Sequence, residues 1–208
     1  MLVQGIEEIN LNTYRLRLRE KMIRKFYQSS TRVCFCVAGF VLLCQAIAAQ
    51  ESGRERRIRF TVPTAPWTLT LPADDFQMAE KQMKQDGTGA YFHLVDERQG
   101  VNLSMFIEPV KDCKDSKSCR DMVWKLGNPA WENPQNVVQS EIGDVSLLEF
   151  LVPSFQGMPI RQQNMYAEFV VDGFWVDMHL SKVRYQPEDH KLFERIVKSI
   201  KFEPKKNL

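Results

Sequence analysis

The sequence predicts an α+β domain, in which an antiparallel sheet of hairpins carries a short middle helix and a C-terminal helix. Three observations predict this class. Several segments alternate apolar with polar residues and are joined by short turns, as in hairpins. Two other segments repeat apolar residues at helical spacing. Helices do not alternate regularly with single strands, which argues against a parallel α/β sheet.

The elements follow one another in a clear order along the chain. The first strand is expected at residues 67–71, where WTLTL alternates cleanly. A hairpin over 90–108 turns at 97–100, and a hairpin over 137–153 turns at Gly143-Asp144. The second strand of that later hairpin is apolar on both faces, which is typical of a buried central strand.

The strongest hairpin signal is Asp172-Gly173, which separates the apolar runs of YAEFVVDGFWVDMHLS. A two-residue turn pairs Val171 with Phe174 and makes one face of the hairpin wholly apolar. That face is predicted to lie in the core, with Phe169 and Val176 buried. The opposite face carries Glu168 and Asp177, which we expect to be at least partly exposed.

Two helices complete the domain. Ser118 and Asp121 predict a capping box at the start of the middle helix, which ends at Gly127. The C-terminal helix is expected to begin at Pro187, which suits a first helical position, and its apolar residues repeat as far as Ile200.

The N-terminal segment is typical of a secretory signal peptide. Basic residues precede the apolar stretch VCFCVAGFVLLCQAIAA at 33–49, and small residues end it, so cleavage is expected after Ala48 or Ala49. The alternative is an uncleaved membrane anchor, because this stretch is just long enough to span a bilayer. The first 21 residues are unusual for a signal peptide, so we expect translation to begin at Met22.

These boundaries divide the chain into four parts. Residues 1–49 are the signal peptide, 50–59 a polar tether, 60–204 a single α+β domain and 205–208 a tail. The protein is therefore expected to be periplasmic or secreted, with membrane contact only through residues 33–49 if they stay uncleaved. The segment 1–49 has a net charge of +4 and the remainder −2, which excludes a phosphate-neutralising surface and hence nucleic acid as a partner.

Only Cys113 and Cys119 lie outside the signal segment. A close pair of cysteines in an exported protein favours a structural disulfide. Free thiols remain an alternative. A metal site is disfavoured because no histidine lies nearby to complete a zinc set.

The polar face of the Asp172-Gly173 hairpin carries the residues that could form a metal-binding or catalytic site. Its register sets Glu168 opposite Asp177, and His179 lies two residues further along the same face. Two opposed carboxylates repel each other, so they could hold a cation or share a proton in a hydrolase. The simpler interpretation is a solvated face, on which water or a basic side chain screens the charges.

Three aromatic residues are candidates for ligand binding. Trp131 lies between turn-forming residues, and Trp175 and Tyr166 share the polar face of the hairpin. Packing under a neighbouring loop is the competing interpretation for these side chains. No cofactor is expected, since no nucleotide-binding loop, nucleophile elbow or HExxH zinc motif is present.

The element order, the early WTLTLP, the VDGFWVDMHL hairpin and the closing IVKSIKFEP resemble the PsbP-like family over about residues 60–204. The resemblance implies an α/β/α sandwich and, because the family's members share no single activity, a non-catalytic role. The sequence therefore favours an exported accessory protein that binds an envelope protein or another envelope component. The alternative is a small metal-dependent or carboxylate-based hydrolase that uses Glu168, Asp177 and His179.

Overall fold

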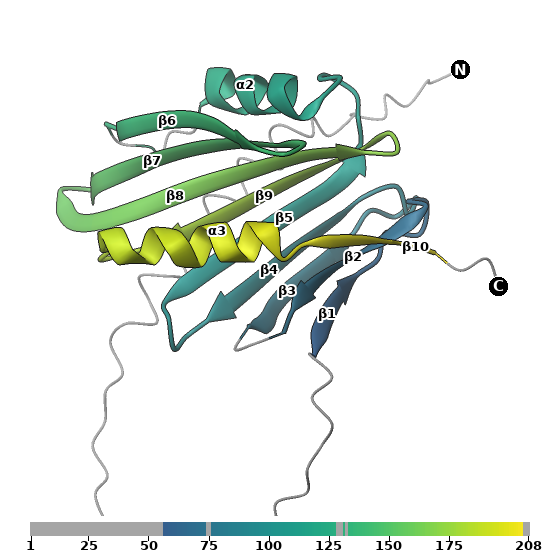
Figure 1. Cartoon of the computed structure of the whole chain (residues 1–208), viewed down its shortest axis with the longest axis horizontal. Helices are drawn as coiled ribbons and strands as arrows, with labels where there is room; N and C mark the ends of the chain where they lie inside the picture. Colours follow the sequence, from purple (N-terminus) through teal and green to yellow (C-terminus); the bar gives the residue numbers. More distant parts are fainter. Residues whose placement is uncertain (1–55, 74–75, 128–130, 132, 206–208) are drawn as a thin grey trace, which may run out of the picture. The chain divides into compact units, whose positions relative to one another are not determined.

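The computed structural model describes residues 56–73, 76–127, 131 and 133–205 (Figure 1). These residues belong to one compact unit, Gly53–Leu208. The predicted signal peptide lies outside the described residues, and so do positions 206–208 of the predicted tail. None of the helices in the described part is long and apolar enough to cross a membrane.

A seven-stranded antiparallel sheet forms the centre of the unit, and it contains all three predicted hairpins. Its strands run in the order β3-β4-β5-β9-β8-β7-β6 (Figure 1). Their bounds are β3 Gln77–Met83, β4 Ala90–Asp96, β5 Val101–Pro109, β6 Gln135–Ile142, β7 Val145–Phe155, β8 Met158–Val171 and β9 Phe174–Lys182. The α+β class predicted from the sequence is confirmed.

The central hairpin has the predicted register, with Val171 opposite Phe174. Both turn residues have positive φ, 47° for Asp172 and 75° for Gly173. A two-residue turn of this kind needs this left-handed backbone at both positions, and Asp and Gly tolerate it better than most residues. The local sequence at this turn therefore sets the pairing of two long strands.

A second sheet of three strands was not expected from the sequence. It consists of β1 Arg57–Phe60, β2 Trp67–Pro72 and β10 Lys201–Pro204, in the order β1-β2-β10. The predicted first strand is β2, but it pairs outside the main sheet. The predicted tether over 50–59 is also wrong at its end, because Arg57 pairs with Pro72 and its guanidinium donates to Thr70 Oγ1 at 3.0 Å.

The helices lie at the predicted places, with shifted starts. Helix α2 spans Ser116–Leu126, and a single 3-10 turn at Pro187–Asp189 precedes helix α3, His190–Lys198. The cap of α2 is Asp115, whose carboxylate accepts from the backbone N–H of Ser118 at 2.7 Å. Ser118 therefore occupies the third helical position and not the cap, and its hydroxyl accepts the backbone N–H of Asp115 in return.

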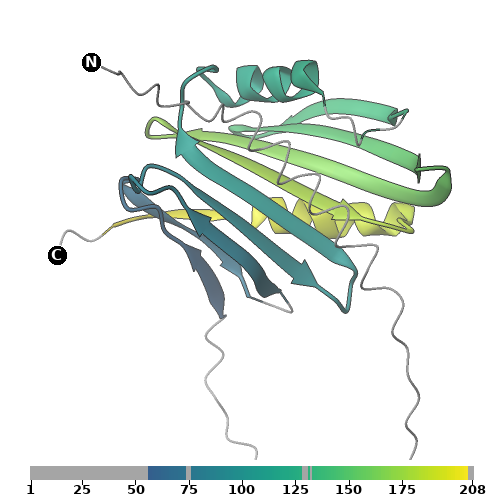
Figure 2. The same ribbon diagram turned by 180° about the vertical axis from the view of Figure 1, so that it is seen from behind.

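The two faces of the main sheet carry separate apolar clusters. The larger core contains Phe193, Ile196 and Val197 of α3 together with buried residues of both sheets. The smaller core contains Cys119 and Val123 of α2 with side chains of β7, β8 and β9. Helix α3 crosses the near face of the sheet in Figure 1 and lies behind the sheet when viewed from the other side (Figure 2). The two helices therefore cover opposite faces.

Candidate functional site

The face of the main sheet beneath α2 holds most of the residues that the sequence singled out. Across the central hairpin Glu168 faces Asp177 and Tyr166 faces His179, as predicted. The predicted core face is also confirmed, since Phe169 and Val176 are buried in the larger core. The polar and apolar faces of this hairpin are therefore assigned correctly from the sequence.

The expected exposure of the acidic pair is wrong. Glu168 is 0% exposed and Asp177 is 2% exposed. The physical reason is that α2 and the smaller core cover this face of the sheet, while neighbouring strands flank the hairpin on both sides. Strand β5 flanks β9 and β7 flanks β8, so neither strand of the hairpin is at an edge. The N-terminal turn of α2 also contacts β8, where the backbone N–H of Val170 donates to Ser116 Oγ at 3.1 Å.

The indole of Trp175 stabilises Glu168. Its Nε1–H donates to Glu168 Oε2 at 2.6 Å, and the Trp175 side chain is itself buried. A hydrogen bond to a carboxylate is stronger than one between neutral groups, and a buried carboxylate needs such donors to offset its desolvation. Trp175 therefore acts as a structural partner of the acidic pair.

His179 is engaged by groups other than the acidic pair. Its ring stacks on Tyr166 with centroids 4.2 Å apart, and its Nε2 lies 3.0 Å from Asn164 Oδ1. Asn164 is buried, and its Oδ1 also accepts from the side chain of Gln162 at 2.8 Å. These contacts fix the position of His179 within a row of polar side chains on β8 and β9.

The predicted metal set of Glu168, Asp177 and His179 is not assembled as a coordination site. Within the described part of the chain, no three His, Cys, Asp or Glu side chains are placed to hold a metal ion. The register brings the two carboxylates together across the hairpin. His179 belongs to the next cross-strand pair and contacts Asn164, so sharing a sheet face was not enough to make it a third ligand.

The three predicted ligand-binding aromatic residues belong to the smaller core. The ring of Trp131 lies edge-on to that of Phe150, with ring centroids 4.8 Å apart. It stacks on the ring of Trp124, with centroids 5.7 Å apart. It also contacts Tyr166, and both Tyr166 and Trp175 are buried. Stacking of a ligand on these rings would require the packing around α2 to open. The competing interpretation, that neighbouring structure covers them, matches this arrangement.

The predicted disulfide lies at the start of α2. Cys113 and Cys119 are bonded, with Cα atoms 5.0 Å apart, within the range expected for a disulfide. Cys119 is fully buried in the smaller core. The bond therefore ties the segment before the helix to the turn that packs on the sheet.

A buried carboxylate that the sequence did not single out lies at the start of α3. Glu149 is on the α3 side of β7, and its Oε2 is 3.2 Å from Nδ1 of His190. Burial raises the pKa of the Glu149 carboxyl above its ordinary value of 4.5, and the nearby Glu194 charge raises it further, while His190 opposes both effects. The charged form of Glu149 is therefore less favourable in the folded protein than in the unfolded chain.

This raised pKa predicts a specific pH dependence of stability. The folded state holds the Glu149 proton more tightly, so stability falls as the pH rises from 4.5 through the raised pKa of the folded state. Glu149→Gln removes this ionisation. We expect its melting temperature relative to the unmodified protein to be higher at pH 7 than at pH 4, as measured by thermal melts across that range.

Asp86→Asn is the control with the opposite sign, in the turn between β3 and β4. Hydrogen bonds from the side chain and the backbone N–H of Thr88 lower the pKa of Asp86, so its charged form supports folding above its ordinary pKa. The control is expected to lose relative stability as the pH rises. Parallel melting curves for Glu149→Gln and the unmodified protein from pH 4 to 7 would contradict the assignment.

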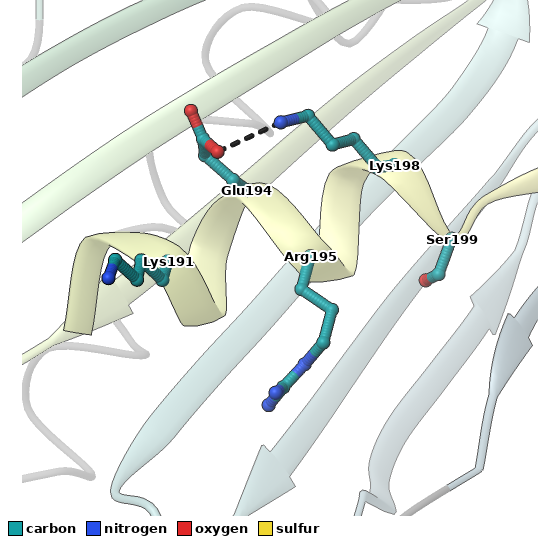
Figure 3. A pocket seen from close by; sticks show the side chains of 5 residues that line it. All are labelled: Lys191, Glu194, Arg195, Lys198 and Ser199. Atoms are coloured by element: carbon teal, nitrogen blue, oxygen red, sulfur yellow. Dashed lines mark hydrogen bonds and ion pairs between the residues drawn. The ribbon is translucent and has the colours of Figure 1, made fainter. Parts of the chain in front are cut away.

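The outer surface of α3 bears an open hollow of about 410 Å³ that the sequence interpretation missed. Five residues line it: Lys191, Glu194, Arg195, Lys198 and Ser199 (Figure 3). Lys198 forms an ion pair with Glu194 at 2.9 Å, and Arg195 extends from another side of the helix, away from that pair. The signal available in the sequence was the spacing of three cations at positions i, i+4 and i+7 on a helix whose other side is apolar.

Comparisons with known proteins give distant structural similarity. No protein-family model and no curated protein matches the chain. The solution structure of cyanobacterial PsbP (CyanoP) from Synechocystis sp. PCC 6803 is 14% identical, with a TM-score of 0.49, and the match covers 74% of this chain and 96% of that one. The Saccharomyces cerevisiae Ran-binding protein Mog1p is 12% identical, with a TM-score of 0.40 and coverage of 71% and 96%.

Proposed function

We propose that the protein is an exported, non-enzymatic accessory protein that binds another protein of the cell envelope. Export is supported by the disulfide between Cys113 and Cys119, because such bonds persist in oxidising compartments. The signal-like composition of residues 1–49 supports the same location.

The observation that carries the non-enzymatic part of the proposal is the environment of the acidic pair. Glu168 and Asp177 are almost fully buried, and Trp175 donates directly to Glu168. A carboxylate that acts as a general acid or base must come within hydrogen-bond distance of the substrate. The packing around this pair favours a role in holding β8, β9 and α2 together. The hydrolase hypothesis therefore has less support than binding.

The binding part of the proposal is supported by the contrast with the outer surface of α3. There the charged side chains of Lys191 and Arg195 are exposed, and the structure gives them no ion pair with any described residue. Exposed charges at a surface hollow can contact a partner without opening the fold. A stable interaction would then use the surface of the domain and not its interior.

The test is chemical cross-linking of the full-length tagged protein in the intact cells that produce it, followed by purification and identification of the cross-linked protein. We expect one envelope protein to be enriched above a tag-only control. Asp177→Asn should enrich the same protein to the same extent, since the buried pair has a structural role. Absence of a specific partner, recovery of the chain in the cytosol, or loss of the partner in a folded Asp177→Asn variant would overturn the proposal.

A further inference from the structure

We propose that the hollow on α3 binds an extended acidic segment of a protein partner, with Lys191 and Arg195 each contacting one carboxylate. This inference rests on the proposed binding function and adds the chemistry of the partner. Its basis is the geometry, charge and packing of α3.

Helix α3 holds its charges in a fixed position. Its inward residues Phe193, Ile196 and Val197 are buried in the larger core, so the helix cannot easily rotate. Its outward residues Lys191, Arg195 and Lys198 are exposed, and the Arg195 side chain extends away from the Glu194–Lys198 ion pair (Figure 3). The basic side chains are therefore presented by a rigid element, which lowers the entropic cost of binding a partner.

The cations of α3 are not needed to cap the end of their own helix. The carbonyl of Arg195 accepts from the backbone N–H of Ser199, and the carbonyl of Ile196 accepts from the Ser199 hydroxyl at 2.7 Å. The carbonyl of Val197 accepts from the backbone N–H of Ile200. The last turn is thus closed by the backbone and by Ser199, which leaves the basic side chains available for other contacts.

Carboxylates neutralise some cations of the domain, whereas Lys191 and Arg195 are among the exposed cations that form no ion pair with a described residue. Arg59 pairs with Glu203 at 3.1 Å, Lys84 with Glu108 at 3.0 Å and Lys182 with Asp189 at 3.2 Å. Among the described residues, no carboxylate forms an ion pair with Lys191 or Arg195. An acidic partner would supply the missing negative charges, and an arginine can bind a carboxylate through two parallel hydrogen bonds.

The spacing of the two cations selects an extended segment. Lys191 and Arg195 are four residues apart on a helix, a rise of about 6 Å. In an extended chain, residues two positions apart are separated by about 7 Å and point to the same side. Acidic residues at alternate positions of an extended segment would therefore match the two cations.

An acidic protein segment fits this surface better than an anionic membrane. Glu194 lies within the hollow, and Glu188 is exposed just before the helix, so the surface carries both signs of charge. A continuous layer of negative headgroups would be repelled by these carboxylates. Discrete carboxylates on a peptide can contact the cations and avoid Glu194.

The test measures direct binding of the full-length protein to a fluorescein-labelled peptide of alternating Glu and Thr residues, by fluorescence anisotropy at low ionic strength. Two exposed ion pairs contribute little individually, so Lys191→Gln/Arg195→Gln is expected to weaken binding about tenfold. Lys111→Gln/Lys125→Gln is the matched control, since it removes two exposed cations elsewhere and should leave affinity within about twofold. Melting curves of both double variants establish that they remain folded.

Two further arms separate the alternatives. A peptide of equal composition with its Glu residues in one block should bind more weakly than the alternating peptide. Vesicles of phosphatidylglycerol should bind no more tightly to the unmodified protein than to the Lys191→Gln/Arg195→Gln variant. Equal loss of peptide binding in both double variants, no preference between the peptides, or vesicle binding that depends on Lys191 and Arg195 would overturn the inference.

The outcome also separates this inference from the proposed function. If the α3 double variant still cross-links the same envelope protein as efficiently as the unmodified chain, the acidic-segment site is wrong and the binding function stands. If the unmodified protein cross-links no specific partner, the proposed function itself fails. Loss of the cross-linked partner only in the α3 variant supports both.

Discussion

Replacement of Phe193 by alanine is expected to lower the free energy of unfolding by about 3–5 kcal/mol. Phe193 is 0% exposed, and its ring packs in the core between α3 and the two sheets. Its removal loses the transfer free energy of a buried aromatic side chain and leaves a cavity that a rigid sheet cannot fill. Chemical denaturation monitored by circular dichroism measures the change.

The conservative variant Phe193→Leu keeps most of the volume and is expected to cost less than about 1.5 kcal/mol. It provides a measurable folded protein if the alanine variant does not fold. Leucine at position 193 should still hold α3 against the core. Phe193→Leu is therefore expected to keep the basic surface of α3 in place and to bind the acidic peptide with unchanged affinity. An alanine variant that loses less than about 1 kcal/mol would show that α3 is not anchored as the structure indicates.

Replacement of Trp175 by phenylalanine is expected to lower the free energy of unfolding by about 3 kcal/mol, because a buried carboxyl oxygen loses its hydrogen-bond donor. The indole Nε1–H lies 2.6 Å from Glu168 Oε2, inside the sheet–α2 interface. Phenylalanine fills most of the indole volume and cannot donate. Equilibrium unfolding in urea gives the difference between the two proteins.

The matched control is Trp124→Phe in the same small core. Trp124 is half-buried, packs on Trp131 and Phe150, and donates no hydrogen bond to any described residue. Trp124→Phe should lower the free energy of unfolding by about 1 kcal/mol, from the loss of packing alone.

A double-mutant cycle of Trp175→Phe with Glu168→Gln should give a coupling energy of about 1–2 kcal/mol. Additive effects of the two changes would show that this bond contributes nothing to stability.

Local sequence patterns predicted the three hairpins correctly because both the turn and the strand faces are encoded in neighbouring residues. Asp172-Gly173 is the clearest case, since two residues that tolerate positive φ set the register of β8 and β9. The disulfide also followed from local spacing. Strand β3 was missed because its sequence QMAEKQM shows no apolar alternation, and pairing with β4 forms it.

The small sheet could not be predicted from local patterns. Strand β2 pairs with β1 on one side and with β10 on the other, and β10 comes from the far end of the domain. The pairing of segments separated by more than a hundred residues depends on tertiary packing, and short strands carry too few residues to signal it. Residues 57–59 were assigned to a polar tether for a different reason: strand β1 has only four residues, RIRF, and is too short to show a strand pattern, although it pairs with the nearby β2.

The sequence by itself determined the α+β class, the positions of the three hairpins, and the register and faces of the Asp172-Gly173 hairpin. These features depend on turn geometry and on the two-residue period of a strand. The tertiary structure decided the environment of those faces. Burial of Glu168 and Asp177 depends on strands and a helix from other parts of the chain, and no local period records what packs on top of a residue. The hollow on α3 likewise exists only because the core turns one side of that helix inward and leaves Lys191 and Arg195 outside.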